Sequence, residues 1–152
     1  MQLSDSKFAK TFKDKYPVIT AQVNDCEKLN SPLVKTIKSI GDVQNNRYES
    51  AKLLHDMFDC IVILKGSGTI IYDGDKFYTC MDGNHRMAVA GMGDTLSGIL
   101  LCELSLNPDI FDACIKATTF HSYAADHLFK SRKMKNFLPS MIPDTYSKLV
   151  NI

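Results

Sequence analysis

The run Cys60–Lys65, with the sequence Cys-Ile-Val-Ile-Leu-Lys, constrains the fold more than any other segment of the chain. It is continuously apolar and rich in β-branched residues, whereas a strand with one solvated face alternates apolar and polar residues. Such a run is typical of a strand buried on both faces, as in the parallel sheet of an α/β protein. The sequence therefore predicts an α/β fold with this strand inside the sheet.

Further strands are expected on either side of this run in the sequence. Tyr16–Thr20, with the sequence Tyr-Pro-Val-Ile-Thr, is predicted to be a short buried strand. Pro17 is compatible with this prediction, because proline is tolerated at the first position of a strand or on an edge strand. After Gly66-Ser67-Gly68, a hairpin is predicted from Thr69–Tyr72 and Lys76–Thr79, which flank Asp73-Gly74-Asp75. We expect a mostly parallel sheet with this β-hairpin as an extension and with flanking helices.

Helical periodicity and stop signals predict the remaining elements. Helical turns are expected over Asn24–Ile40, ended by Gly41, and longer helices are expected over Asn46–Phe58, Thr95–Leu106, Asp109–Phe129 and Pro143–Val150. Met81–Ala90 is expected to be a loop. Repeats and linker-like tracts are absent, so residues 1–152 are predicted to form a single domain.

Charge and composition limit the classes of partner. The 152 residues carry a formal net charge of +1, so the chain lacks the excess of positive charge that typically binds nucleic acid or an anionic membrane. The polar, lysine-containing start fits neither a signal peptide nor a membrane span. We expect a cytoplasmic protein without a nucleic-acid or membrane partner.

The five cysteines are odd in number and dispersed, without a C-x-x-C pair. This spacing argues against a zinc site and a disulfide framework. The histidines are isolated as well, so no set of protein metal ligands is predicted. Most of the cysteines have apolar neighbours, which favours small buried hydrophobic side chains in a reducing compartment.

The segment Gly91-Met92-Gly93-Asp94-Thr95 carries the clearest chemical signal, because it enters a predicted helix. Amides at a helix entrance lack intrahelical acceptors and lie at the positive end of the macrodipole, and glycine lets an anion approach the backbone. Asp94 has two interpretations: an N-cap, or a base that takes a proton from a hydroxyl attacking a bound phosphate. In the second, Mg²⁺ offsets the crowded negative charge.

Four segments together resemble a known family: Ile63–Ile71, Asp73–Asp75, Asn84–Gly98 and His121–Asp126. Their order and spacing resemble the ADP- or ATP-dependent NAD(P)H-hydrate dehydratases, a branch of the ribokinase-like superfamily. The resemblance runs from about Pro17 to Val150. Members of that family are considerably longer, so the chain is similar to the C-terminal, nucleotide-binding part, and a partial ribokinase-like fold is expected.

The resemblance also implies roles for particular residues. It assigns ADP or ATP to the lysine-glycine-x-x-threonine segment, here Lys65, Gly66, Ser67, Gly68 and Thr69, and to Gly93, beside which Gly91 completes the amide cradle. Asp94 matches the family base, which contacts the substrate hydroxyl. The implied reaction is dehydration of hydrated NAD(P)H through phosphorylation of the nicotinamide ring and elimination.

Two loops depart from the family pattern. The family's threonine-proline-histidine-proline-glycine-glutamate is replaced by Thr20–Asp25, so that Gln22 lies where a histidine contacts substrate. The asparagine-proline-glycine-methionine-alanine-threonine loop is here Asn84–Val89, with His85 and Arg86 at its second and third positions and Val89 at its last. These changes leave open whether the chain is catalytically active.

Three interpretations of function remain open on the sequence. The chain is a nucleotide-dependent dehydratase or a fragment of one, a ribokinase-like kinase of a small alcohol that uses the same aspartate, or an eroded module that binds nucleotide or associates with another chain. If the chain is a truncation, the strand at Pro17–Thr20 becomes an open edge. A homo-oligomer or a complementing chain is then expected.

Overall fold

The computed structural model describes residues 18–21, 40–131 and 138–150. The chain forms two compact units, Met1–Thr79 and Cys80–Ile152. Each unit is described by itself below. The expected helical turns over Asn24–Ile40 lie outside the described residues except at Ile40.

The first unit contains a sheet with the strand order β1-β2-β3-β4. Strand β1 (Val18–Ala21) is parallel to β2 (Ile61–Leu64), with Val18 opposite Ile61. Strand β3 (Thr69–Tyr72) is antiparallel to β2, and β4 (Phe77–Cys80) follows it. Parallel pairing is thus limited, among the described strands, to β1 and β2, because the chain turns back directly after β2 instead of crossing over through a helix.

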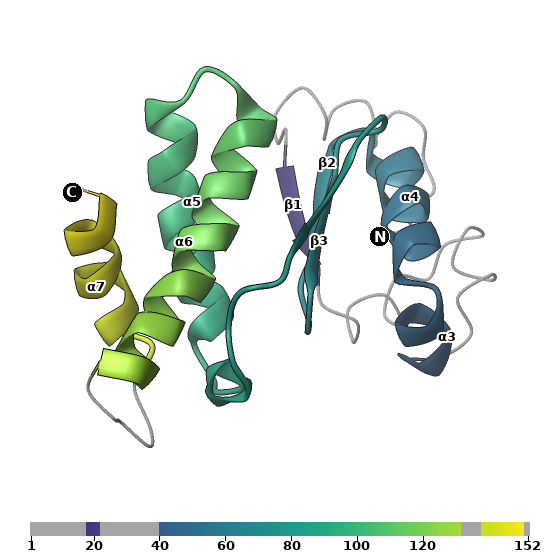
Figure 1. Ribbon diagram of the computed structural model, residues 1–152. Coiled ribbons are helices and arrows are strands. Elements are labelled where there is room, and N and C mark those ends of the chain that lie inside the picture. Colours follow the sequence, from purple (N-terminus) through teal and green to yellow (C-terminus); the bar gives the residue numbers. More distant parts are fainter. Residues whose placement is uncertain (1–17, 22–39, 132–137, 151–152) are drawn as a thin grey trace. The chain divides into compact units, whose positions relative to one another are not determined.

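Helix α4 (Arg47–Phe58) packs against β2 and β3 in the first unit, as Figure 1 shows. Its predicted amphipathic pattern is confirmed, and its buried side chains join those of the strands in one apolar cluster made of Val43, Ala51, Leu54, Met57, Phe58, Cys60, Val62, Leu64, Ile70 and Tyr72. Asp59 ends the helix in a left-handed conformation with φ of 49° and turns the chain into β2. Gly41 does not end a helix, because it lies inside the short helix α3 (Ile40–Asn45).

The prediction that β2 is buried on both faces is confirmed. Val62, Ile63 and Leu64 are successive residues, whose side chains alternate between the two faces of a sheet, and all three have an exposed fraction of 0%. The predicted hairpin is also confirmed. Its turn is held by the Asp73 carboxylate, which accepts hydrogen bonds from the amides of Asp75 at 2.9 Å and Lys76 at 2.7 Å.

The second unit is a layer of helices (Figure 1). It contains the short 3₁₀ helix η2 (His85–Met87) and the helices α5 (Met92–Leu106), α6 (Ile110–Ser131) and α7 (Met141–Val150). Helix α6 packs against both α5 and α7, and small side chains at Ala113, Ala117 and Ala124 allow close approach. None of the helices in the described part of the chain is both long and apolar enough to cross a membrane.

Helix α5 begins earlier than expected, at Met92 rather than Thr95. Met92 is buried and forms the first anchor of the apolar side of the helix, which continues through Leu96, Ile99 and Leu100. Burial of this side chain stabilises a helical first turn that contains Gly93, although glycine has a poor helix propensity. The expected ends of α4, α6 and α7 agree with the structure to within a few residues.

Candidate functional site

The predicted nucleotide-binding segment Lys65–Thr69 forms the tight connection between β2 and β3. Lys65 directly follows the last residue of β2, at the carboxyl end of a strand in a parallel pair, where α/β sheets usually bind ligands. The Thr69 hydroxyl donates to the Gly66 carbonyl at 3.2 Å and closes the turn. Gly68 has a φ of +66°, a left-handed conformation that favours glycine.

A residue that was not predicted from the sequence also holds this turn. The Arg47 guanidinium donates from Nη2 to the Leu64 carbonyl at 3.1 Å and from Nη1 to the Ser67 carbonyl. A Cβ at Gly66 would lie 3.0 Å from Nη2 of Arg47, so the guanidinium closely approaches the Gly66 backbone. The turn is therefore held by a cation from helix α4.

The second predicted group, Gly91 to Thr95, opens helix α5. Gly91 is the N-cap residue, with a left-handed φ of +87° and no side-chain cap. The first helical hydrogen bond runs from the Thr95 amide to the Gly91 carbonyl at 3.0 Å. The amides of Gly93 and Asp94 precede that bond and so have no acceptor within the helix.

The interpretation of Asp94 as the N-cap is wrong. Asp94 lies inside the first turn of α5, its side chain is exposed, and Gly91 occupies the cap position. The nearby hydroxyls of Thr95 and Ser97 both donate to carbonyls of their own helix, at 3.0 Å each. The Asp94 carboxylate is thus left facing solvent at the positive end of the helix, where its charge is favourable.

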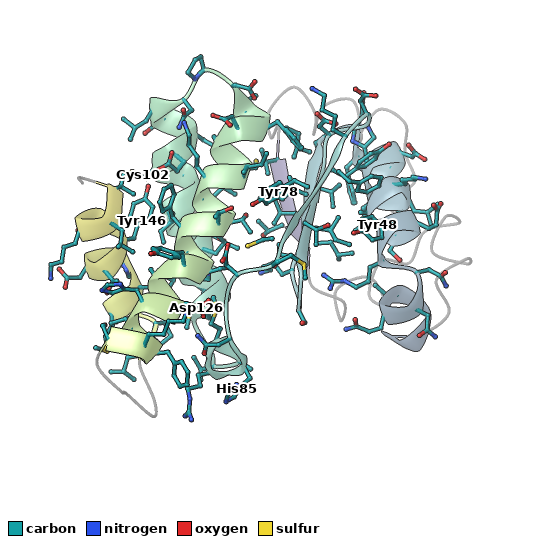
Figure 2. All side chains as sticks on the ribbon, in the orientation of Figure 1. Tyr48, Tyr78, His85, Cys102, Asp126 and Tyr146 are labelled. Carbon is teal, nitrogen blue, oxygen red and sulfur yellow. The ribbon has the colours of Figure 1, made fainter. Side chains whose placement is uncertain are left out.

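The loop before α5 is held by a carboxylate on α6. Asp126 accepts a hydrogen bond from the Gly83 amide at 3.1 Å and another from the Asn84 side-chain amide at 2.7 Å. The Asn84 oxygen in turn accepts from the Arg86 amide at 3.1 Å and caps η2. Figure 2 shows Asp126 beside the loop that carries His85.

The structure describes some of the residues at which the two loops depart from the family pattern. The Arg86 guanidinium lies over the Phe129 ring, 5.3 Å from its centroid, and Val89 is 44% exposed. A cation–aromatic contact of this kind orients the guanidinium toward its own protein. Gln22 lies outside the described residues.

No metal-ligand cluster is found in the parts of the chain that the structure describes. No group of three histidine, cysteine, aspartate or glutamate side chains is close enough there to hold a metal ion. Cys60, Cys80 and Cys114 are buried, as expected, whereas Cys102 is exposed. Burial raises the pKa of the Cys114 thiol to about 12, so it stays protonated and unreactive at neutral pH.

The predicted site residues therefore form two groups, each local to one unit. Lys65, Gly66, Ser67, Gly68 and Thr69 belong to the first unit, and Gly91, Gly93 and Asp94 belong to the second. Sequence reasoning missed Arg47. One signal for Arg47 is present in the sequence: a cation stands in the first turn of a predicted helix, where acidic residues are preferred.

A family model and several curated relatives that match this chain point to the same protein family. The family model described as NAD(P)H-hydrate dehydratase matches residues 4–148. The bifunctional NAD(P)H-hydrate repair enzyme Nnr of Vibrio cholerae is 31% identical over 136 residues, which are 90% of this chain and 25% of that enzyme. The ADP-dependent (S)-NAD(P)H-hydrate dehydratase of Staphylococcus aureus is 28% identical over 72% of this chain and 40% of that enzyme.

Solved structures agree on the fold. A Bacillus subtilis ADP/ATP-dependent NAD(P)H-hydrate dehydratase, co-crystallised with ATP and Mg²⁺ and soaked with CoA, has a TM-score of 0.72 at 22% identity, over 86% of this chain and 48% of that one. A ribokinase-like superfamily protein from Enterococcus faecalis has a TM-score of 0.73 at 22% identity, over 95% of this chain and 50% of that one. The chain thus has a ribokinase-like α/β fold and spans about half the length of these structures. Because the family model matches most of the length of this chain, the chain belongs to the NAD(P)H-hydrate dehydratase family.

Proposed function

We propose that this chain binds ADP or ATP and takes part in the nucleotide-dependent dehydration of hydrated NAD(P)H, as an enzyme or as part of one. The observation that carries the proposal is the entrance of α5. There, unpaired backbone amides and an exposed carboxylate lie side by side on a turn opened by Gly91. Amides of this kind bind phosphate oxygens, and the carboxylate is free to accept a proton.

The roles of the other residues follow from charge and shape. Lys65 and the glycine turn after it offer an ammonium group and backbone amides to the nucleotide. The amides at Gly91 and Gly93 bind anionic phosphate oxygens, and Asp94 takes the proton from the substrate hydroxyl as that hydroxyl attacks phosphorus. The nucleotide leaves with one phosphate fewer. Loss of the transferred phosphate from the ring, together with a proton from the neighbouring ring atom, then forms a double bond and completes the dehydration.

Mg²⁺ fits the proposal as an ion carried by the nucleotide. Mg²⁺ is often bound by one or two carboxylates together with substrate phosphates, and the described residues contain no complete protein cage. When bound, the ion offsets negative charge on the phosphates. The exposed Asp94 carboxylate is the side chain of this site with the donor chemistry to approach it.

The proposal is tested with Asp94→Asn, and with Asp112→Asn as the control. Asp112 also lies in the first turn of an exposed helix end, that of α6, but outside the proposed site. ADP or ATP with Mg²⁺ should raise the melting temperature of the wild type and both variants, because the backbone amides are retained. Turnover of hydrated NADH, followed by the return of NADH absorbance, should fall about 10²–10⁴-fold in Asp94→Asn alone.

Other outcomes select other functions. Phosphorylation of a sugar or a similar alcohol without turnover of hydrated NADH would identify a kinase that uses the same aspartate. Stabilisation by nucleotide without any turnover would identify an eroded binding module. The contact of Arg86 with Phe129 favours that module over the kinase, since it holds a bulky cation at the loop position where the family pattern has glycine. An absence of any nucleotide effect would contradict both enzymatic functions and leave a module that associates with another chain.

The proposed partners are the nucleotide, hydrated NAD(P)H, and a second protein chain, either another copy or a complementing fragment. Strand β1 supports the last of these. It lies at one end of the order of the described strands and pairs with β2 alone among them. An edge strand offers unpaired amides and carbonyls to another chain.

A further inference from the structure

Arg47 occupies an unfavourable position. It is the first residue of helix α4, where the positive end of the macrodipole disfavours a cation. Its side chain is half-buried, and this burial lowers the pKa of the guanidinium below its ordinary value. A charge placed at this position requires compensation from groups that accept its hydrogen bonds.

The compensation comes from the turn after β2. The two terminal nitrogens of Arg47 donate to the carbonyls of Leu64 and Ser67, on either side of Lys65-Gly66. A guanidinium presents its donors in a rigid planar fork, so it fixes the spacing and orientation of the two carbonyls. A Cβ at Gly66 would lie 3.0 Å from Nη2, so a side chain there would push the guanidinium from its present position.

Fixing these carbonyls also fixes the direction of the amides. The described residues contain no cis peptide bond, and in a planar trans peptide the N–H of the following residue points away from the carbonyl. With the Ser67 carbonyl directed to Arg47, the Gly68 amide therefore points away from the guanidinium. The Gly66 carbonyl is likewise taken by the Thr69 hydroxyl, so the Ser67 amide points away from that bond.

We propose that Arg47 is a positioning residue for the nucleotide: by holding the carbonyls of Leu64 and Ser67, it turns the amides of the glycine loop outward to bind phosphate. Arg47 acts through the turn, because both of its terminal nitrogens donate to turn carbonyls. This inference rests on the proposed function, since it concerns the same nucleotide segment. The inference adds a residue of α4 to the proposed nucleotide segment, which otherwise lies in the connection between β2 and β3.

The test compares Arg47→Met, Arg47→Lys and the control Lys52→Met. Lys52 is an exposed cation on the same helix, and its side chain pairs with Glu49 at 2.9 Å. Binding of ADP with Mg²⁺ is measured by calorimetric titration. Amide hydrogen exchange at Gly66–Thr69 is measured with and without ADP. Arg47→Met should weaken ADP binding about 10- to 100-fold and reduce the protection that bound ADP gives these amides, because the charge-assisted hydrogen bonds that orient the turn are lost.

Arg47→Lys should fall between wild type and Arg47→Met, since an ammonium keeps the charge but loses the fork. Lys52→Met should match the wild type in both measurements. If Arg47→Met fails to fold, the comparison of Arg47→Lys with Lys52→Met decides the question. A wild-type ADP affinity in the Arg47 variants, or wild-type protection of the Gly66–Thr69 amides by ADP, would overturn the inference and leave the proposed function standing. Failure of the wild type to bind nucleotide would overturn both.

Discussion

Gly91 and Gly98 lie at the start and in the interior of helix α5, and replacing them is expected to have opposite effects on stability. Gly91 adopts a φ of +87°, which an L side chain adopts at a cost, although a Cβ there would meet its nearest atom, in Pro139, only at 3.5 Å. Gly98 lies in the helix interior with no atom within 4 Å of an added Cβ. The first glycine is needed for its backbone conformation, whereas the second lowers helix stability.

Gly91→Ala is therefore expected to lower the free energy of unfolding by about 1–2 kcal/mol, because left-handed backbone is strained for alanine. Gly98→Ala should raise it by about 0.5–1 kcal/mol through better helix propensity. Urea unfolding of the two variants beside the wild type measures both values. Equal effects of the two changes would show that the left-handed cap is not what stabilises the entrance of α5.

The buried carboxylate of Glu103 is a second feature at this scale. It accepts hydrogen bonds from the Tyr146 hydroxyl and from the Asn107 side-chain amide, the latter at 2.8 Å. Burial, followed by the hydrogen bond and the charge of Glu103, raises the pKa of Tyr146 above its ordinary value of 10.0. Figure 2 shows Tyr146 on α7, turned toward the helices that α7 packs against.

Tyr146→Phe should lower the free energy of unfolding by about 1–3 kcal/mol at neutral pH, since Glu103 loses a donor while remaining buried. The folded protein holds the phenolic proton more tightly than the unfolded chain does. This contribution is therefore complete below pH 10 and is lost as the pH rises from there toward the raised pKa. Chemical unfolding against pH should show the advantage of the wild type over Tyr146→Phe shrinking in alkali. Tyr123→Phe, at an exposed tyrosine on α6, should change little, and a constant difference across pH would contradict the linkage.

At the scale of elements, sequence patterns correctly predicted the helices, strands and turns that depend on interactions between residues close in the sequence. The apolar run of β2, the Asp-Gly-Asp turn and the periodicity of α4 and α6 each identify their element within a few residues. The start of α5 was placed too late, because Gly91 and Gly93 indicate a loop until the burial of Met92 is known. The Lys65–Thr69 turn was located correctly, but its contact with Arg47 joins distant parts of the sequence, which periodicity does not reveal.

The hairpin of β3 and β4 gives an element-scale prediction. Burial alone would raise the pKa of Asp73, but hydrogen bonds from the Lys76 and Asp75 amides more than offset this, and the pKa is lowered below 3.8. Asp73→Ala should lower the free energy of unfolding by about 1 kcal/mol, whereas Asp75→Ala, whose side chain lies exposed in the same turn, should not. Because the folded pKa is the lower one, the contribution is present above pH 3.8 and is lost as the pH falls below it. Unfolding curves at neutral and acidic pH test both statements, and a loss in Asp73→Ala that persists in strong acid would argue against the carboxylate.

At the scale of the whole molecule, the position of β1 bears on assembly. The proposed association through this strand should appear as a sedimentation coefficient that rises with protein concentration. Thr20→Lys, on the strand itself, should shift the protein toward monomer, because charged side chains on edge strands oppose pairing. Lys76→Thr, at an exposed position outside β1, serves as the control. A wild type that remains monomeric at all concentrations would remove the second chain from the proposal.

The anchoring of Gly83 and Asn84 by Asp126 separates two properties of the loop before α5. Its backbone course is dictated by one carboxylate on α6, through a main-chain amide and a single asparagine. Of the side chains that follow, Arg86 adds a contact with Phe129 on the same helix, whereas Val89 is exposed. Mutation at an exposed position such as Val89 can therefore change the chemistry of the loop while the path of its main chain is inherited unchanged.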